Sequence, residues 1–383
     1  MTDKKLSTIL THSGSNPKKY DGVVNIPPHR ASTIIFNSFK DFENIAKAPY
    51  PYGRAGTPST TAFEKVISEL ENAKGSVATC SGLSAITITF MTFVKPGDHI
   101  LVTDNVYGYT RRFCEENLKK LGVEIEYYPA DIGSKIKDLF KKNTKLLFME
   151  APGSLTYEIC DIDKLVTEAK SKKIITVMDN SWASPLLFKP LDHGIDVSLM
   201  SATKYIAGHA DAMLGVVSGT SKTYSKIKRT AVTMGICPGS EEVYLGLRGL
   251  RTLEIRLKEH ESRALELAKW LEKQPQVKKV MHPALKSFPS HKLWKKYFTG
   301  SCGTFGIELK DTNKKKFGKM LDSFKLFHMG ASWGGYESLC FPVQPIRTTD
   351  PSINDLFHLR IHVGFEDMDD LKADLANGFK QLK

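Results

Sequence analysis

Two residues that could take part in catalysis lie at the ends of apolar runs of strand length. Lys204 lies in the stretch Ser201 to His209, directly after the run 197–200, and Asp179 ends the run 174–179. A lysine at the end of a buried strand stands where a ligand binds and can form a Schiff base with a carbonyl group. A buried carboxylate nearby can keep a pyridine nitrogen protonated, which makes the ring an electron sink. Alone, Lys204 could be a surface lysine and Asp179 a turn former, but together they favour the catalytic interpretation.

Two further stretches follow strands and could complete a site for a phosphorylated ring. In the stretch Thr79 to Ala85 a strand passes through Ser and Gly into a helix, whose free N–H groups and dipole favour a phosphate. The hydroxyl groups of Ser201 and Thr203 could donate hydrogen bonds to the same phosphate. In the stretch Asp104 to Thr110, Tyr107 could lie flat on the ring, although an ordinary aromatic at a sheet edge has the same pattern.

The elements that must position these residues alternate along the chain. Strands are predicted at 76–79, 99–103, 124–128, 146–150, 174–179, 197–201 and 214–218, with helices at 84–93, 110–121 and 162–172. Strands that alternate with helices imply right-handed crossovers and a mostly parallel sheet covered on both faces. We therefore predict an α/β fold whose strands end at one ligand-binding edge.

The chain divides at two changes of pattern. The first fifty residues lack clear periodicity and indicate an extended arm, whereas helical spacing begins at Pro58. A long helical segment at about 241–273 leads into a smaller α+β unit. In this unit, strands are predicted at 303–309 and 359–363 and helices at 312–324 and 367–382. The predicted units are an N-terminal arm (1–58), a large cofactor-binding domain (59–250) and a C-terminal α+β domain (251–383).

In this order and spacing, the stretches resemble the Cys/Met-metabolism family of pyridoxal-phosphate enzymes, which have the aspartate-aminotransferase fold (fold type I). The resemblance runs from Tyr52 to Arg360 and covers nearly the whole chain. It implies pyridoxal 5'-phosphate as the cofactor, with Lys204 bonded to it covalently, Asp179 at the pyridine nitrogen and Tyr107 stacked on the ring. The residues that it implies for the phosphate are Gly82, Leu83, Ser201 and Thr203.

The resemblance also implies a homo-oligomer with shared active sites. Tyr52 and Arg54 match an arm motif that reaches the neighbouring subunit's phosphate site, where Tyr52 would join Lys204 and Tyr107 as a catalytic residue. An arginine suits a phosphate dianion, although Arg54 by itself could lie in a solvated loop. Arg360 matches the residue that grips the substrate α-carboxylate. We expect dimers that share their sites and pair into a tetramer.

Two motifs concern the bond that is cleaved. The stretches Glu150 to Ser154 and Ala331 to Leu339 resemble those of cystathionine β-lyases. The γ-acting relatives usually show Asn-Pro in the first stretch and carry Leu where Trp333 stands. Ser332 and Trp333 are therefore the predicted substrate-binding residues beside Arg360, although Trp333 could also be a packed core aromatic. Ala331 departs from the family pattern, because γ-acting relatives carry Glu there and many β-lyases carry Tyr.

The implied activity is cleavage of L-cystathionine to L-homocysteine, pyruvate and ammonia, a step of methionine biosynthesis. One alternative is a cystathionine or methionine γ-lyase, which would release 2-oxobutyrate instead of pyruvate. Another is an amino-acid racemase acting on alanine at the same site, with Tyr52 or Tyr107 as a proton donor opposite Lys204.

The net charge is the one unusual feature of an otherwise globular composition. The chain has 54 Lys+Arg and 42 Asp+Glu, a net charge of +12, which could indicate a nucleic-acid partner. The lysines are scattered in short groups, so we disfavour that class. The six cysteines are far apart and no Cys–His grouping has zinc-ligand spacing, so we expect reduced thiols and no metal. No apolar stretch has the length of a signal peptide or a membrane span, and we expect a cytoplasmic protein.

Overall fold

Two sheets organise the computed structural model, which describes residues 4–311, 313–354 and 358–382. The large sheet has seven strands in the order β1-β7-β6-β5-β4-β2-β3. Its strands are β1 (Gly75–Thr79), β2 (His99–Thr103), β3 (Glu124–Tyr128), β4 (Thr144–Glu150), β5 (Ile175–Asp179), β6 (Val197–Met200) and β7 (Gly215–Gly219). All neighbours from β6 to β3 are parallel, and only β7 runs antiparallel to β1 and β6. The predicted α/β class with a mostly parallel sheet is confirmed.

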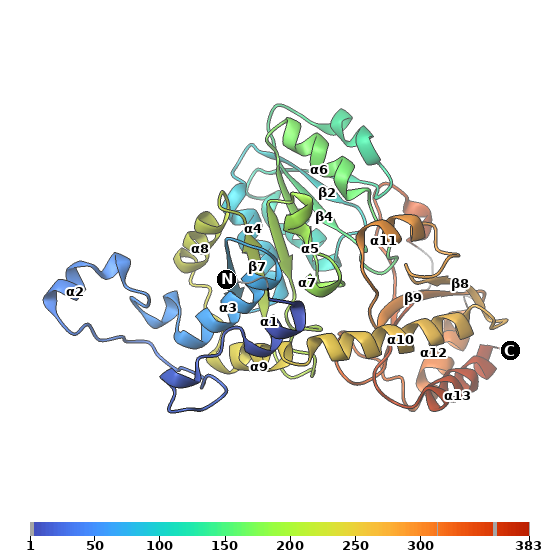
Figure 1. Ribbon diagram of the computed structural model, residues 1–383. Coiled ribbons are helices and arrows are strands. Elements are labelled where there is room, and N and C mark those ends of the chain that lie inside the picture. Colours follow the sequence, from blue (N-terminus) through green and yellow to red (C-terminus); the bar gives the residue numbers. More distant parts are fainter. Residues whose placement is uncertain (1–3, 312, 355–357, 383) are drawn as a thin grey trace.

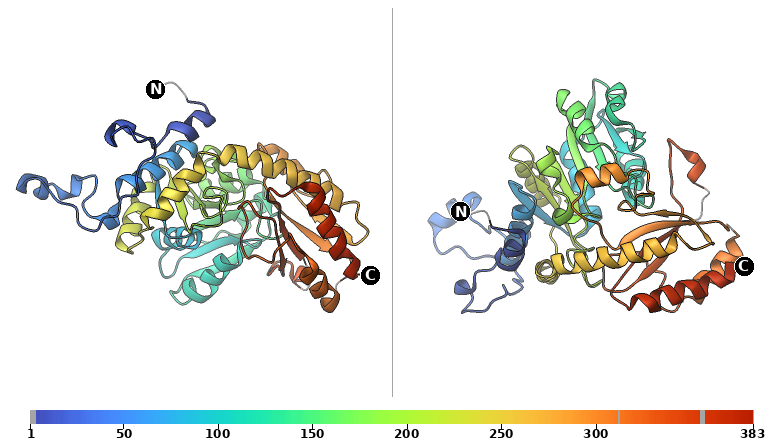
Figure 2. Two further views of the ribbon diagram at one scale, coloured as in Figure 1. Left: turned by 90° about the horizontal axis from the view of Figure 1, so that it is seen from below. Right: turned by 45° about the vertical axis from the view of Figure 1, so that its right-hand side comes forward.

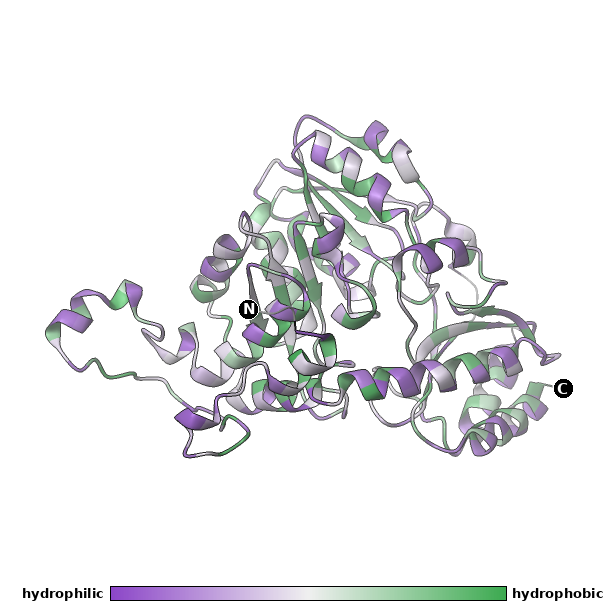
Figure 3. Ribbon diagram, in the orientation of Figure 1, coloured by the Kyte–Doolittle hydropathy of each residue, from purple (hydrophilic) through white to green (hydrophobic). Residues whose placement is uncertain are grey.

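Helices cover both faces of this sheet because its strands are apolar on both sides. Within β2, Leu101 belongs to one core cluster, whereas Ile100 and Val102 belong to the other. Helices α3 (Pro58–Leu70), α6 (Ile162–Ser171) and α9 (Ser240–Leu250) share the first cluster, and α4 (Gly82–Phe93), α5 (Gly108–Phe113) and α8 (Tyr224–Thr233) share the second. Figure 3 shows the resulting hydrophobic centre of the sheet.

The second sheet is antiparallel and has four strands in the order β10-β11-β9-β8. Its strands are β8 (Val277–Met281), β9 (Thr304–Leu309), β10 (Leu339–Val343) and β11 (His358–His362). Helices α12 (Lys314–Ser323) and α13 (Met368–Phe379) pack in its core. The predicted helix start at Thr312 lies outside the described residues. Two shorter helices are α7 (Ser184–Leu187) and α11 (His291–Tyr297).

Helix α10 (Leu253–Leu271) connects the two sheets, as Figure 1 and both views of Figure 2 show. Its residue Leu257 packs in the core of the large sheet, whereas Leu267 and Leu271 pack in the core of the small one. One helix therefore fixes the distance between the strand ends of the large sheet and the strands of the small sheet. The domain boundaries given above stay a prediction.

The single long helix predicted at about 241–273 is wrong, because the chain turns between α9 and α10. The carbonyl of Gly249 accepts hydrogen bonds from the backbone N–H of Thr252 (3.2 Å) and the Arg256 guanidinium (2.8 Å) instead of continuing the helical ladder. At the turn, Arg251 donates to the carbonyls of Leu10 (2.6 Å) and Ser13 (2.9 Å). The break thus allows the half-buried Arg251 and the buried Arg256 to satisfy backbone carbonyls.

The N-terminal arm projects from the body of the molecule (Figures 1 and 2). It contains α1 (Leu6–His12), which the sequence pattern did not predict, and α2 (Phe39–Glu43). Leu10 of α1 is 2% exposed, whereas Ile35 and Phe39 are 85% and 74% exposed. Folding of one chain therefore covers the beginning of the arm but leaves its apolar tip uncovered.

The described residues contain neither a membrane-spanning helix nor a cluster of metal ligands. Within those residues, no helix is long and apolar enough to cross a membrane. Across the same part of the chain, no three His, Cys, Asp or Glu side chains group as metal ligands. The six cysteines are free, and four of them are buried.

Candidate active site

The C-terminal ends of β5 and β6 bring two of the predicted residues to one edge of the large sheet. Asp179 is the last residue of β5 and pairs with Leu199 of β6. Lys204 follows β6 after one turn, and its backbone N–H donates to the carbonyl of Ser201 at 3.1 Å. The Ser201 N–H donates to the Ser181 hydroxyl at 2.8 Å, which ties the two strand ends together.

The Lys204 ammonium group faces a loop from the small sheet. Its Nζ donates to the Ser332 hydroxyl at 2.7 Å and lies 5.3 Å from the centroid of the Trp333 ring. Burial, together with the charge of Arg360, lowers the pKa of Lys204 from 10.5 to about 8. A lysine in this environment is partly neutral near pH 8 and can act as a nucleophile and as a proton acceptor.

This lowered pKa predicts how protein freed of its carbonyl ligand should recapture one. Only the neutral amine adds to a carbonyl, so the rate should rise about tenfold per pH unit below pH 8 and level off above it. Stopped-flow absorbance after mixing with pyridoxal phosphate measures the profile. A rate that keeps rising up to pH 10 would place the pKa of Lys204 at its ordinary value and contradict the prediction.

Asp179 is a buried carboxylate without a counter-charge. It is 7% exposed, and its Oδ1 accepts the backbone N–H of Ser181 at 2.9 Å. Burial raises the pKa of Asp179, and the hydrogen bonds from Ser181 offset only part of this effect. Among the described residues Asp179 makes no ion pair, so its environment fits a cationic group supplied by a ligand, such as a protonated ring nitrogen.

A cradle for an anion lies at the N-terminus of α4. Ser81 and Ser84 form a reciprocal capping box, which leaves the backbone N–H groups of Gly82 and Leu83 without a partner in the described part of the chain. A Cβ on Gly82 would lie 2.5 Å from the Ser201 Cβ, so glycine allows Ser201 to approach these N–H groups. Free N–H groups at a helix N-terminus beside a hydroxyl fit a phosphate.

Thr203 lies close to this cradle but its hydroxyl is already used. The hydroxyl accepts the N–H of Leu214 at 2.9 Å and donates to the carbonyl of the same residue at 3.1 Å. A contact with phosphate would have to replace the second of these bonds. The role of Thr203 therefore stays a prediction whose geometry is less direct than that of Ser201.

Glu150 holds Tyr107 in place, a contact that the sequence motifs did not reveal. Its Oε2 accepts the Tyr107 N–H at 2.7 Å, and it pairs in register with Asp179 on the neighbouring strand. Burial, and then the charge of Asp179, raises the pKa of Glu150 well above its usual value. Burial and the nearby Tyr109 likewise raise the pKa of Tyr107, a residue that is still 42% exposed. Tyr107 is thus a neutral phenol with a face open to a ligand.

The small sheet contributes Arg360, in the middle of β11. One guanidinium nitrogen, Nη2, donates to the carbonyls of Gly330 (3.1 Å) and Ser332 (2.9 Å). The other two nitrogens have no hydrogen-bond partner in the described residues, which leaves one edge of the planar group for a carboxylate. Burial lowers the pKa of Arg360, but an arginine stays charged at neutral pH.

Tyr52 and Arg54 lie elsewhere in the single chain. Arg54 donates to the carbonyl of Val232 and lies 5.9 Å from the Tyr52 ring centroid. It lines a cavity of about 230 Å³ between the arm and α8. No contact among the described residues joins Tyr52 or Arg54 to Lys204, so the structure of one chain does not bring them to the site.

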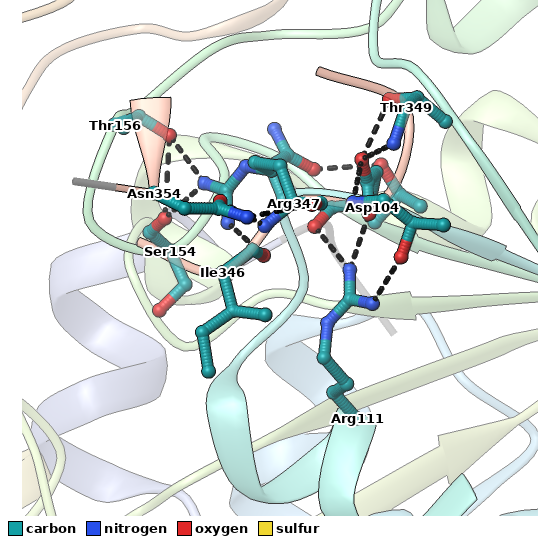
Figure 4. A network of polar contacts seen from close by, with 11 residues as sticks. Asp104, Arg111, Ser154, Thr156, Ile346, Arg347, Thr349 and Asn354 are labelled. Atoms are coloured by element: carbon teal, nitrogen blue, oxygen red, sulfur yellow. Dashed lines mark hydrogen bonds and ion pairs between the residues drawn. The ribbon is translucent and has the colours of Figure 1, made fainter. Parts of the chain in front are cut away.

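A buried polar network next to Tyr107 fastens the two parts of the molecule together (Figure 4). Asp104, 2% exposed, forms an ion pair with Arg111 and accepts the backbone N–H groups of Thr348 (2.9 Å) and Thr349 (2.7 Å). Burial alone would raise the pKa of Asp104, but the hydrogen bonds from the threonines and Arg111 hold it below its usual value. Nearby, Arg347 donates to the Ser154 carbonyl at 3.1 Å. Loop 344–354 is thereby held beside Tyr107.

Arg111→Ala should therefore lower stability strongly, by about 3–5 kcal/mol, because it leaves Asp104 buried without its cation. The neighbouring Arg112 provides a matched control, since its side chain is 63% exposed and, within the described chain, pairs with Glu116 alone. Arg112→Ala should change stability by at most about 1 kcal/mol. Thermal denaturation of both variants, with cofactor present, measures the difference. Equal melting temperatures would contradict the importance of the network.

Comparisons with known proteins agree with this arrangement. The family model described as Cys/Met metabolism PLP-dependent enzyme matches residues 7–380. Cystathionine beta-lyase MetC of Escherichia coli (strain K12) is 39% identical, with all of both chains covered. L-alanine/L-glutamate racemase of Wolbachia pipientis wMel is 40% identical, with 99% of this chain and 98% of the relative covered by the alignment. 

A solved structure supports the fold in the same way. Cystathionine gamma synthase from Xanthomonas oryzae, in complex with aminoacrylate and cysteine, is 28% identical and superposes with a TM-score of 0.93 over 99% of both chains. The predicted fold type of PLP-dependent transferases is thus confirmed. The buried uncompensated Asp179, the reactive Lys204 and the anion cradle at α4 fit the cofactor that this family uses. The chain belongs to the Cys/Met metabolism PLP-dependent enzymes, and pyridoxal 5'-phosphate (PLP) is its cofactor.

Proposed function

We propose that this enzyme is a carbon–sulfur β-lyase that cleaves L-cystathionine to L-homocysteine, pyruvate and ammonia. The observation that carries the proposal is the loop Ser332 to Gly335, which resembles that of cystathionine β-lyases and puts the Trp333 ring and the Ser332 hydroxyl against Lys204 Nζ. The relative named cystathionine beta-lyase, 39% identical over the full chain, supports it. Methionine biosynthesis is the corresponding metabolic role.

Bound PLP supplies an electron sink for the carbanion formed at the substrate Cα. Arg360 would hold the substrate carboxylate with the free edge of its guanidinium, which orients the Cα–H bond toward Lys204. Lys204, with its pKa lowered to about 8, would remove this proton. Asp179 would keep the ring nitrogen protonated through its uncompensated negative charge.

The Cβ–S bond then breaks, and the departing sulfur needs a proton. Lys204 carries the proton taken from Cα and can return it to sulfur, which releases homocysteine. Tyr107 is a second candidate donor, because burial raises the pKa of its phenol and keeps it protonated. The three-carbon enamine left behind reacts with water and gives pyruvate and ammonia.

A second subunit would complete each site. Tyr52 and Arg54 lie on the projecting arm and, among the residues that the structure describes, make no contact with the site of their own chain, which supports a role in a partner's phosphate site. The uncovered apolar residues of the arm also suit a subunit interface. We propose a dimer with shared sites, paired into a tetramer, that works in the cytoplasm without a nucleic-acid or membrane partner.

The test is to purify the protein with PLP, add L-cystathionine, and identify the keto acid and the thiol. A β-lyase releases pyruvate and homocysteine, whereas a γ-lyase releases 2-oxobutyrate and cysteine. Absence of pyruvate would refute the proposal. Salt-sensitive binding to nucleic acid without turnover would instead support the disfavoured class.

A second candidate activity is racemisation of L-alanine at the same site. It is favoured by the relative named L-alanine/L-glutamate racemase, which is 40% identical. Racemisation needs a proton donor on the face opposite Lys204, and Tyr107 or the partner's copy of the arm tyrosine is the candidate. Chiral chromatography after incubation with L-alanine tests for the D-isomer, and strict retention of configuration would exclude this activity.

A further inference from the structure

Strand β11 presents two side chains to the loop 330–335. Residues two apart on a strand point to the same face, and Arg360 and His362 both do so. Arg360 donates to the carbonyls of Gly330 and Ser332, as described above. The Nε2 atom of His362 lies 3.1 Å from the Gly334 nitrogen and 3.0 Å from the Gly335 carbonyl oxygen. The strand therefore holds the loop at both ends, and the His362 end has no role in the scheme above.

The loop is pressed against the backbone that carries Lys204. Gly334 has a φ of +90°, and a Cβ at this position would lie 2.9 Å from the Lys204 carbonyl carbon and from the Tyr205 nitrogen. Only glycine permits this conformation and this approach. The position of Gly334 thus determines where the two preceding residues, Ser332 and Trp333, stand relative to Lys204 Nζ.

The chemistry of the His362 ring suits a structural clamp. The ring is fully buried, and burial lowers the pKa of His362 to about 4. The imidazole is therefore neutral at neutral pH. Its Nε2 can accept the Gly334 N–H in one tautomer or donate to the Gly335 carbonyl in the other. Either bond ties the ring to the same part of the loop, at Gly334 or at the neighbouring Gly335.

We propose that His362 is a positioning residue of the active site, which fixes the loop 330–335 and through it the Ser332 hydroxyl and the Trp333 ring against Lys204. Its effect on catalysis rests on the proposed function, whereas its effect on the loop does not. His362 acts through the loop and needs no contact with substrate or cofactor.

Two substitutions of similar size separate the clamp from general packing. His362→Gln keeps a polar group where Nε2 stands, whereas His362→Asn keeps one only near Nδ1. In the holoenzyme we expect the amides of 333–335 to exchange hydrogen at least about tenfold faster in the Asn variant and near the wild-type rate in the Gln variant. We expect kcat/KM for cystathionine to fall by about the same factor in the Asn variant and to recover with Gln.

His260→Asn is the matched control. His260 is also fully buried, with its ring 5.1 Å from that of His362, but its hydrogen bond goes to the Val363 carbonyl at 2.9 Å and not to the loop. In His260→Asn, the amides of 333–335 should exchange hydrogen at the wild-type rate. Wild-type exchange in His362→Asn, or equal acceleration in all three variants, would overturn the proposal. If His362→Asn does not fold, the Gln variant still tests the proposal. Tenfold faster hydrogen exchange of the loop amides in His362→Gln would by itself overturn the proposal. If the variants show the expected exchange pattern but the wild-type enzyme does not cleave cystathionine, only the proposed function is refuted.

Discussion

Replacing Lys204 with alanine is expected to remove both the visible absorbance of bound PLP and the lyase activity. The amine is the group that would bond the cofactor, accept the Cα proton and return a proton to sulfur, so no other residue at the site can take over these steps together. The loss of turnover should be at least about 10³-fold, since general base catalysis alone contributes 10²- to 10⁴-fold. Absorbance spectra and pyruvate release from the purified variant measure the two effects.

Two controls make the Lys204 result specific. Lys204→Arg keeps a positive charge but no nucleophilic amine, so it should be as inactive as the alanine variant. Lys222→Ala removes an exposed lysine and should behave as the wild type. Borohydride reduction of the wild-type holoenzyme, followed by peptide mapping, should place the cofactor on Lys204. Label on another lysine, or full activity of Lys204→Ala, would refute the assignment.

Most strands of the large sheet could be predicted from the sequence because they are buried, apolar runs of strand length. Strands β2 and β3 begin and end where the pattern predicts them, and the other strands of the large sheet differ by at most two residues. In a parallel sheet the carboxyl ends meet at one edge, so Asp179 and Lys204 could be placed together without knowing the structure.

The edge strands of the small sheet could not be predicted, for physical reasons. Strand β8 exposes Lys278 and Lys279 in succession and contains a register shift, which removes the alternating pattern. Strand β10 contains Pro342, which has no N–H and is tolerated because the strand lies at the edge. Sequence patterns record local periodicity, and these strands are formed by pairing with distant neighbours.

The candidate site shows the same division between local and distant information. The glycine that begins the helix of the phosphate cradle, Gly82, is a local signal. The contacts of Glu150 with Tyr107 and of His362 with the loop at Gly334 join residues 43 and 28 positions apart. A motif can mark such residues as unusual, but only the folded chain shows what they hold.

Replacing Asp179 with alanine is expected to slow removal of the substrate Cα proton by about 10²- to 10³-fold, as for loss of one electrostatic stabilising group, while Lys204 and Arg360 stay in place. Its negative charge is what would keep the ring nitrogen protonated, and without it the ring is a weaker electron sink. Exchange of the Cα proton with deuterated solvent, followed by NMR with PLP at saturating concentration, measures this step directly. Asp179→Asn should be nearly as slow, because it keeps the shape but loses the charge.

A matched control and the pH dependence complete the test of Asp179. Asp196→Asn changes an aspartate at the opposite end of the same strand pair, where its carboxylate accepts the Thr176 N–H at 3.0 Å, and should leave exchange unaffected. Burial raises the pKa of Asp179, so protein without cofactor should lose the carboxylate, and with it affinity for the protonated ring, as the pH falls through that raised value. Asp179→Asn should lack this acidic limb. Wild-type exchange in both Asp179 variants would show that the site activates Cα without this charge, and the electron-sink role would then have to be assigned to another group.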